Sequence, residues 1–351
     1  MIDFRALTVC EAEAARTLFF QVFGHEAEPA WWVWKYQGSG LEDALHWGAF
    51  DEQGALLAHV GALVYRPSPL SMRGSGVFER GPRYLIQVCD VMVAAQHRGW
   101  QAEGLLYRKL MASFAKALAS RWPDSLAFGF PGPRPHRLGE RLGLYRAFGH
   151  YRQLDSFSFG QGNFAKLSQG LSLRACAWDE ALASVAHFAE NKAAQSSEWA
   201  APMIWRDATY LAWRYRDHPR HRYQAWLVTA KRWFRTQVVG WLVSRALAKG
   251  PPLLVDGYVA GYGLLTALLA LGQHHTPSPD GMHAKAFADE AQKRSTPLDQ
   301  GLWQAWMPDL GELGDVQMVA TQFLYPSQWQ GFTSDEERAK VIFTPGDTDV
   351  W

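Results

Sequence analysis

Apolar and polar positions along the first part of the chain predict a helix followed by a β-hairpin. Residues 8–24 place apolar side chains at helical spacing, and Thr8 with Glu11 has the arrangement of a capping box at the helix start. Residues 44–65 form two strand-like runs, and Gly54 in the turn between them can adopt the positive φ that such turns use. This order is typical of an α/β (α+β) fold.

The next elements form the most informative stretch of the sequence. The run 83–94 is continuously apolar, as expected of a strand that is covered on both faces. Residues 95–122 contain a short polar turn and then a helix whose apolar positions form one stripe. The pattern then predicts a buried strand at 125–133, a short helix within 135–149 and a strand at 150–160.

The second half of the chain repeats this order with different loops. The pattern predicts a helix at 179–193, a hairpin at 223–247, a strand at 251–259 and a buried helix at 261–272. The run GLWQAWMPDL at 301–310 then stands where SLAFGFPGP stood in the first half.

Two matches at one sequence offset indicate a duplication. Trp34-Lys35-Tyr36 corresponds to Trp213-Arg214-Tyr215, and Gly61 corresponds to Gly240, both at a distance of 179 residues. We interpret the two Trp-base-Tyr triplets as aromatic core whose basic side chain reaches to solvent.

The boundary between the two copies is expected within residues 159–170, where glycines and polar residues cluster. The predicted domains are therefore 1–160 and 161–351.

Composition narrows the classes of function. Lys and Arg number 35 against 34 Asp and Glu, so no net charge selects nucleic acid or an anionic membrane. Three widely separated cysteines argue against a disulfide framework and a structural zinc site, and they fit a reducing cytoplasm. Charged residues interrupt the first apolar run, and the longest uncharged stretch, 257–272, is too short to cross a bilayer. We therefore expect a cytoplasmic protein without a nucleic-acid partner or a membrane span.

The turn after the strand 83–94 carries the clearest chemical signal. A turn that leaves a buried strand and enters a helix presents free backbone N–H groups at the positive end of the helix dipole, which suits an anion. Gly99 and Gly104 leave room for a ligand oxygen, and Arg98 and His97 add charge or hydrogen-bond donors. The Gly-Lys-Ser/Thr of a nucleotide P-loop and the Gly-x-Gly-x-x-Gly of a dinucleotide fold are missing, so the turn by itself predicts phosphate binding and nothing narrower.

The order helix, hairpin, long strand, Arg-Gly turn, helix, strand, short helix resembles the GNAT superfamily of N-acyltransferases over most of residues 1–159. DVMVAAQHRGWQAEGLLYRKL resembles the strand-turn-helix signature of that superfamily, and FGFPGPRPHRLGERLGL resembles its later strand and helix. The resemblance implies two GNAT-like domains in tandem, each with a mixed, mainly antiparallel central sheet flanked by helices. The second domain looks degenerate, because its VDGYVAGYGLL has no arginine at the turn.

The resemblance also implies acetyl-CoA or another acyl-CoA as co-substrate, with the pantetheine arm along the long strand and the pyrophosphate on the turn. By similarity the cofactor-binding residues are Val91, Met92 and Val93 for pantetheine, and Arg98, Gly99, Trp100, Gln101, Ala102, Glu103 and Gly104 for pyrophosphate. Gln101 and Glu103 depart from the small residues of the family. A carboxylate at Glu103 would repel a pyrophosphate unless its side chain turns away.

Catalysis by such an enzyme needs a base for the amine proton and an acid for the departing thiolate. Asp90 resembles the carboxylate that some relatives use as base, directly or through water; the alternative is a buried carboxylate that caps a neighbouring loop. The position of the family's tyrosine acid is occupied here by Gly139, and Tyr145 is nearby, so the acid is missing or supplied from elsewhere.

Other candidate sites are weaker. We interpret Cys89 as a buried, inert thiol. The pairs His218/His221 and His274/His275 come without a set of carboxylates or cysteines, so we expect surface histidines and no metal site.

The leading hypothesis is an enzyme, an N-acyltransferase that moves an acetyl or other acyl group from acyl-CoA to an amine of a small molecule or sugar. The alternative is a non-catalytic GNAT-fold binding or scaffold protein that has lost the cofactor site, as Gln101, Glu103 and Gly139 would indicate. A third hypothesis, transfer from an aminoacyl-tRNA, requires a basic groove that the nearly neutral composition does not indicate. The acceptor, the acyl length and the oligomeric state do not follow from the sequence.

Overall fold

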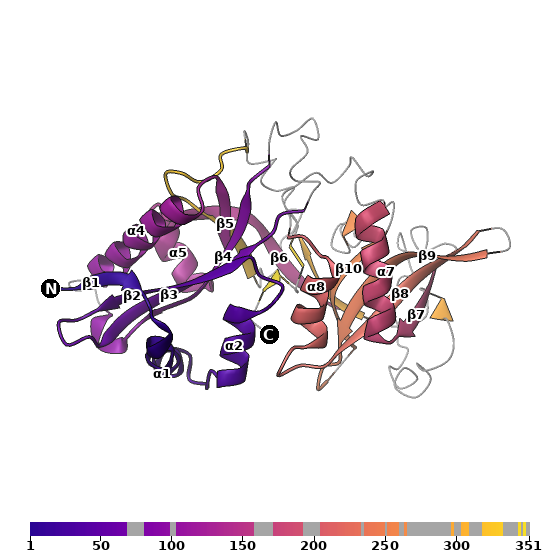
Figure 1. Ribbon diagram of the computed structural model, residues 1–351, viewed down its shortest axis with the longest axis horizontal. Coiled ribbons are helices and arrows are strands. Elements are labelled where there is room, and N and C mark those ends of the chain that lie inside the picture. The colour runs from indigo at the N-terminus through magenta and orange to yellow at the C-terminus, as the bar shows by residue number, and fades with distance from the viewer. Residues whose placement is uncertain are drawn as a thin grey trace. The chain divides into compact units, whose positions relative to one another are not determined.

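The chain forms two compact units in the computed structural model (Figure 1). The structure describes residues 1–68, 81–98, 103–157, 171–191, 204–232, 235–249, 251–259, 263–264, 296–297, 303–308, 318–332, 343–344 and 347–348. Unit 1 comprises Met1–Phe148, Pro202–Trp205 and Val319–Arg338, and unit 2 comprises Gly149–Ala201, Arg206–Met318 and Ala339–Trp351. Both units are mixed α/β structures. The predicted domain boundary falls at residues 159–170, which lie outside the described ranges, and it stays a prediction.

Unit 1 is built on a mainly antiparallel sheet. Its strands are β1 (Asp3–Ala6), β2 (Asp43–Phe50), β3 (Leu56–Tyr65), β4 (Tyr84–Val93), β5 (Ser125–Gly129), β14 (Met318–Phe323) and the first residues of β6 (Tyr145–Phe157), in that spatial order. Neighbours from β1 to β4 are antiparallel, β4 and β5 are parallel, and β14 is antiparallel to β5. The predicted hairpin is confirmed: β2 and β3 flank a turn in which Gly54 has a φ of 81°.

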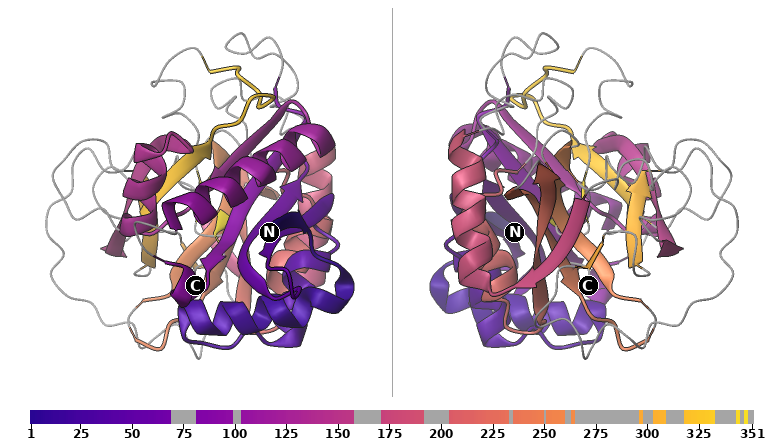
Figure 2. Two further views of the ribbon diagram at one scale, coloured as in Figure 1. Left: turned by 90° about the vertical axis from the view of Figure 1, so that its left-hand side faces the viewer. Right: turned by 90° about the vertical axis from the view of Figure 1, so that its right-hand side faces the viewer.

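Helices cover both faces of this sheet (Figure 2). They are α1 (Ala12–Phe23), which follows the 3₁₀ turn η1 (Val9–Glu11), then α2 (Pro29–Gln37), α4 (Glu103–Arg121) after the turn η2 (Ala95–His97), and α5 (Pro133–Arg141). The capping box is confirmed, since the Thr8 side chain accepts from the backbone N–H of Glu11, and the backbone N–H of Thr8 donates to Glu11 Oε2 at 2.7 Å.

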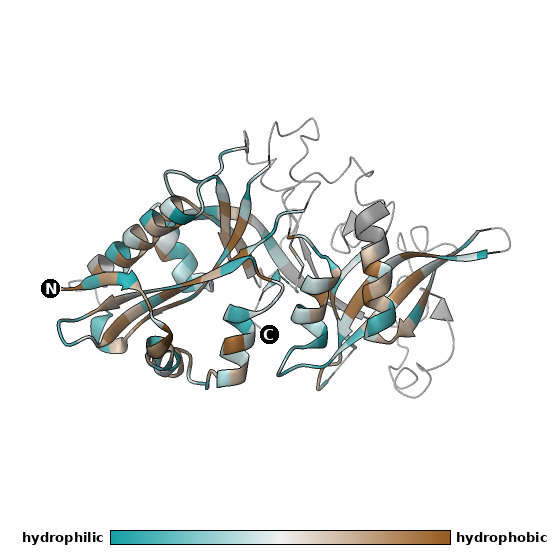
Figure 3. Cartoon of the chain, in the orientation of Figure 1, coloured by the Kyte–Doolittle hydropathy of each residue, from teal (hydrophilic) through white to brown (hydrophobic). Residues whose placement is uncertain are grey.

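The core of unit 1 lies between α4 and the sheet. Because side chains alternate along a strand, Val60, Ala62 and Val64 of β3 face α4, where Leu110 and Phe114 are fully buried against them. The strands are accordingly mostly apolar, whereas apolar and polar residues alternate along α4 (Figure 3). Residues between the core positions, such as His59 and Gly61, face the other side, which α1 and α2 cover.

Unit 2 repeats the strand order of unit 1 in its described part. Its strands are β7 (Leu171–Cys176), β8 (Tyr223–Arg232), β9 (Arg235–Arg245), β10 (Leu253–Val259) and β13 (Trp303–Pro308), with the short strands β11 (Gly263–Leu264) and β12 (Thr296–Pro297), and with residues 149–157 of β6 beside β13. The helical elements are α7 (Trp178–Asn191), α8 (Ala208–Leu211) and the π-helical turn η5 (Ala212–Arg216).

The buried helix predicted at 261–272 is not confirmed. Gly263 and Leu264 form a strand that pairs with the end of β10, and the other residues of that stretch lie outside the described ranges. Among the described residues, no helix is long and apolar enough to cross a membrane.

Candidate functional site

The last residues of β4 separate from the neighbouring strand β5. The parallel pairing of β4 with β5 covers the residue pairs from Tyr84↔Ser125 to Gln87↔Phe128, and β5 ends at Gly129. β4 continues to Val93 while paired with β3 alone among the described strands. The β5 side of residues 88–93 therefore offers backbone N–H and C=O groups that no described strand takes up.

A β-bulge interrupts β4 at Asp90. The β3–β4 register passes from Gly61↔Cys89 to His59↔Met92, so Asp90 and Val91 together lie opposite a single residue of β3. Asp90 adopts a φ of 47°, a left-handed conformation that aspartate tolerates better than most residues. Such a residue costs about 1–3 kcal/mol and persists only where its surroundings hold it.

Lys35 and Tyr36 of helix α2 both contact the Asp90 carboxylate. Lys35 Nζ lies 2.8 Å from the carboxylate, and the Tyr36 hydroxyl donates to Asp90 Oδ2 at 2.5 Å. The side chains of Lys35 and Asp90 are 1% and 8% exposed. Burial, and then the charge of Asp90, raises the pKa of Tyr36 well above its ordinary value, so this phenol remains a donor. Gly61 is required beneath it, because a Cβ there would lie 2.2 Å from the Tyr36 oxygen.

A chain of two hydrogen-bonded histidines ends on the backbone carbonyl of Asp90. His59 Nδ1 lies 2.9 Å from the Asp90 carbonyl oxygen, and His59 Nε2 lies 3.0 Å from His46 Nδ1. Burial lowers the pKa of both imidazoles, that of His46 to about 3. Asp90 is thus fixed through its carboxylate by α2 and through its carbonyl by a chain of neutral histidines on β3 and β2.

The predicted cofactor-binding residues are only partly described. Val91, Met92 and Val93 lie on the segment of β4 that has separated from β5, with Met92 buried and the two valines half-buried. The Arg98 side chain folds back, and its Nε donates to the Val93 carbonyl at 2.7 Å.

The helix predicted after the turn begins at Glu103. Residues 99–102, and with them Gly99, Trp100, Gln101 and Ala102, lie outside the described ranges, as do the side chain of Glu103 and the surroundings of Gly104. The role of the turn in pyrophosphate binding stays a prediction.

Tyr145 occupies the space above Gly139. A Cβ on Gly139 would lie 2.0 Å from the Tyr145 ring and 2.4 Å from its hydroxyl oxygen, and that hydroxyl donates to the Pro135 carbonyl. A tyrosine at position 139 is therefore incompatible with this packing. Burial raises the pKa of Tyr145 above its ordinary value, so its hydroxyl keeps its proton.

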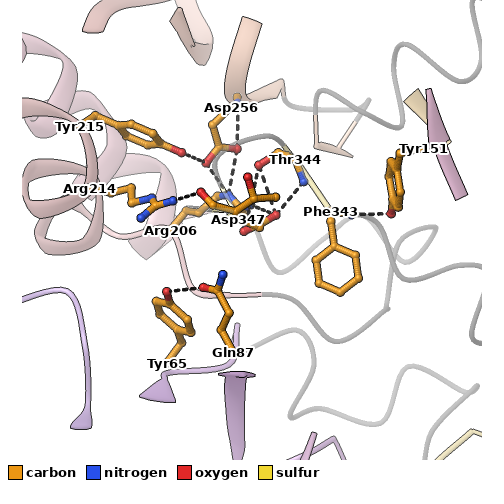
Figure 4. Close-up of polar contacts among 12 residues, drawn as sticks. Tyr65, Gln87, Tyr151, Arg206, Arg214, Tyr215, Asp256, Phe343, Thr344 and Asp347 are labelled. Atoms are coloured by element: carbon orange, nitrogen blue, oxygen red, sulfur yellow. Dashed lines mark hydrogen bonds and ion pairs between the residues drawn. The ribbon is translucent and has the colours of Figure 1, made fainter. Parts of the chain in front are cut away.

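Unit 2 contains a counterpart of the Tyr36–Asp90 contact (Figure 4). The Tyr215 hydroxyl donates to Asp256 Oδ2 at 2.7 Å, and Asp256 lies on β10 just after a register shift. The cation differs, however. Arg206 Nε lies 2.8 Å from Asp256 Oδ2, and Arg206 Nη2 lies 2.6 Å from Asp347 Oδ1, all of them buried.

The basic residues of the two Trp-base-Tyr triplets do not reach solvent, contrary to our interpretation. Lys35 is 1% exposed and neutralises Asp90, while Arg214 is 6% exposed and donates to the Thr348 carbonyl. Each has an inward partner, and in a buried setting an ion pair or a hydrogen bond costs less than an unpaired charge.

The remaining sequence predictions have mixed outcomes. Cys89 is buried, as expected, with its sulfur 3.5 Å from the Tyr36 hydroxyl. His218 is 8% exposed rather than a surface residue, and its ring stacks on His221. His274 and His275 lie outside the described ranges. Within those ranges, no group of three or more His, Cys, Asp or Glu residues is arranged to hold a metal ion.

Sequence reasoning did not find His46, His59 or Arg206. The two histidines are 13 residues apart on adjacent strands, and only the register brings them together. Arg206 lies two residues before α8, outside any helical or strand pattern of apolar residues. The usable signal was the duplication itself, which placed a tyrosine and an aspartate at matching points in both halves.

Comparison with known proteins identifies the fold. No family model and no curated protein matches the sequence. A conserved protein of unknown function from Enterococcus faecalis V583, a probable N-acyltransferase, is similar in structure with a TM-score of 0.56 at 11% identity, over 91% of this chain and 72% of that one.

Two GCN5-related N-acetyltransferases are similar with slightly lower TM-scores. The protein from Kribbella flavida gives a TM-score of 0.52 at 14% identity, over 92% of this chain and 71% of that one. The protein from Anabaena variabilis ATCC 29413 gives 0.52 at 11% identity, over 92% and 72%. The chain thus has the fold of GNAT acyltransferases, in two GNAT-like units, as the sequence predicted.

Proposed function

We propose that the protein is an N-acyltransferase whose unit 1 moves an acetyl or other acyl group from acyl-CoA to an amine of a small molecule or sugar. The observation that carries this proposal is the separation of β4 from β5 after Gln87↔Phe128, next to a bulge whose aspartate is held from two sides. An open strand edge offers backbone hydrogen bonds to an extended ligand with amide groups, such as pantetheine.

The residues of the separated segment and the turn have distinct roles in this proposal. Val91, Met92 and Val93 pair with the amides of pantetheine. Arg98 and the backbone N–H groups of residues 99–104 hold the pyrophosphate, as the start of α4 favours negative charge.

The reaction forms a bond between the amine nitrogen and the thioester carbonyl carbon and breaks the carbon–sulfur bond, with CoA leaving as thiolate. The amine proton goes to a base, which we assign to Asp90 through Tyr36: the phenol oxygen takes the amine proton as the phenol gives its own to Asp90 Oδ2. Lys35 neutralises the carboxylate in the resting state. The Tyr145 hydroxyl, above Gly139, is the described tyrosine nearest to the position of the family's acid.

Ligand-induced stabilisation tests acyl-CoA binding. Acetyl-CoA, a longer acyl-CoA and free CoA should each raise Tm, because a ligand at 100 times its Kd stabilises the native state by about 2.7 kcal/mol. Arg98→Glu should abolish the shift, since it places a negative charge beside the pyrophosphate. Arg66→Glu, a change of an exposed arginine elsewhere in unit 1, is the matched control and should keep it.

The duplication supplies the control for catalysis. Asp90→Asn should retain the shift with acetyl-CoA but lose amine acetylation, whereas Asp256→Asn changes the matching residue of unit 2 and should retain both. If the two variants transfer acetyl groups at equal rates per folded molecule, Asp90 is not the base and its contacts serve the fold alone.

A non-catalytic binding or scaffold protein remains the second candidate, because both Asp90 oxygens are already hydrogen-bonded and position 139 cannot carry the family's tyrosine. It predicts no stabilisation by any CoA species. The proposed enzyme acts in the cytoplasm, where its separated cysteines stay reduced.

A further inference from the structure

Comparing the two units distinguishes contacts that occur in both from contacts that occur in unit 1. A tyrosine that donates to a buried aspartate occurs in both units, so this contact belongs to the shared fold. The hydrogen-bonded pair His46–His59 lies on the paired strands β2 and β3 of unit 1. Counted from the paired glycines Gly61 and Gly240, the strand registers place Val228 and Val238 at the matching positions of unit 2. A polar pair at positions where unit 2 has two valines points to a task at the site of unit 1.

Hydrogen-bond chemistry fixes the tautomers of both histidines. The Asp90 carbonyl can only accept, so His59 carries its proton on Nδ1. Neutral His59 then has a lone pair on Nε2, which accepts from the Nδ1–H of His46. His46 is left with a lone pair on Nε2, oriented by a chain that ends on the backbone of the bulge.

This nitrogen is available to a ligand. His46 is half-buried, and within the described residues its Nε2 makes no hydrogen bond and is not among the fully buried polar atoms that lack a partner, so this nitrogen is not completely shielded from solvent. Burial, His59 and Lys35 lower the pKa of His46 to about 3, so its imidazole is neutral at physiological pH. A base this weak is a hydrogen-bond acceptor rather than a store for the proton of an amine.

A second group beside it also points to a ligand. The Trp32 ring stacks on His46, with centroids 5.3 Å apart and 16° between the planes. Trp32 is 4% exposed, and its Nε1–H is a buried donor with no hydrogen-bond partner in the described part of the chain. An orphaned buried donor costs about 1–3 kcal/mol, which a ligand that accepts from it would recover.

Stacking thus places a donor, Trp32 Nε1–H, and an acceptor, His46 Nε2, on adjacent rings. A hydroxyl group both gives and takes a hydrogen bond, whereas a protonated amine only gives, and the neutral amine that attacks the thioester must keep its lone pair free. Resting on the function proposed above, we propose that the acceptor substrate is an amino alcohol or amino sugar, whose hydroxyl donates to His46 Nε2 and accepts from Trp32 Nε1–H. His59 is the positioning residue that orients His46.

Paired amines test the assignment. With full-length protein and acetyl-CoA, release of the CoA thiol is measured for ethanolamine against ethylamine and for glucosamine against cyclohexylamine. The wild type should prefer the hydroxylated member of a pair by at least about tenfold in kcat/KM, as expected when a site loses a hydrogen-bond partner. His46→Phe should reduce the preference to near one and leave the KM for acetyl-CoA unchanged, and His46→Gln should keep part of it.

Controls separate this inference from the proposed function and from misfolding. His218→Phe replaces a buried histidine of unit 2 and should keep the full preference. In ¹⁵N-histidine NMR spectra of the whole protein, His46 and His59 should both carry the proton on Nδ1. Transfer without a hydroxyl preference, a preference that survives His46→Phe, or a His46 protonated on Nε2 overturns the inference alone. Transfer to none of the four amines overturns the proposed function and this inference with it.

Discussion

Replacing His46 by phenylalanine should reduce the acid sensitivity of the folded state. Burial is the main cause that lowers the pKa of His46 from 6.5 to about 3, and His59 and Lys35 add to it. Because the pKa is lower in the folded state than in the unfolded state, the stability that neutral His46 allows is fully present above pH 6.5 and is lost as the pH falls toward 3.

The size of the effect follows from the two pKa values. A proton that only the unfolded chain binds costs about 1.4 kcal/mol of folding free energy per pH unit. Between pH 7 and pH 4.5, a shift from 6.5 to about 3 amounts to about 2.5 kcal/mol. Tyr36 of α2 and His59 of β3 contact this imidazole, and the positive charge of Lys35 acts on it. Burial lowers the pKa of His59 as well, so the fold keeps both histidines neutral.

Urea unfolding at pH 7.0, 6.0, 5.0 and 4.5 measures this effect, with the transitions of the two units fitted separately. The stability of the wild type minus that of His46→Phe should fall by about 2.5 kcal/mol over this range. His218→Phe is the positive control in unit 2, because burial lowers the pKa of His218 to about 3 as well. If the difference in unfolding free energy between wild type and His46→Phe stays constant with pH, the assignment of a neutral, buried His46 imidazole is refuted. The hydrogen-bond chain derived from that assignment is then refuted as well.

Two further predictions concern packing and buried charge. Arg206→Met should destabilise unit 2 by about 3–5 kcal/mol in urea unfolding, because the buried carboxylate of Asp256 loses its cation; a loss below about 1 kcal/mol would contradict the network. Gly139→Ala should cost about 1–3 kcal/mol, since its Cβ would lie 2.0 Å from the Tyr145 ring, whereas a Cβ on Gly132 meets no atom within 4 Å and Gly132→Ala should change stability by less than about 0.5 kcal/mol. Equal midpoints for the two glycine variants would show that Tyr145 does not fill this space.

Most elements of unit 1 were predictable because local rules determine them. The capping box at Thr8, the turn with Gly54 and the continuous apolar run of β4 each involve neighbours in sequence, and the structure has each of them. The helix α4 follows from a stripe of apolar residues that repeats with the period of an α-helix. The order of these elements then led to the fold that the solved structures share.

The candidate site was less predictable, because long-range register decides which polar residues meet. Lys35 was expected to reach solvent from its aromatic neighbours, yet it turns inward because the bulge places the Asp90 carboxylate beneath it. The same triplet in unit 2 turns Arg214 toward the Thr348 carbonyl instead, since Arg206 has taken the aspartate. The sequence of a triplet therefore does not determine the partner of its base.

The two units together constrain the role of Asp90 more than either does alone. If the contact of a tyrosine with a buried aspartate existed only for catalysis, unit 2, whose strand is followed by no arginine turn, would have no reason to keep it. Its presence in both units indicates that the contact stabilises the fold by fixing a helix to an irregular strand. Any catalytic use of Asp90 in unit 1 must then depend on what unit 2 lacks, namely the histidine chain on its carbonyl and the arginine turn beyond it. Comparing matched substitutions in the two units is for this reason the most direct way to separate folding from chemistry in this protein.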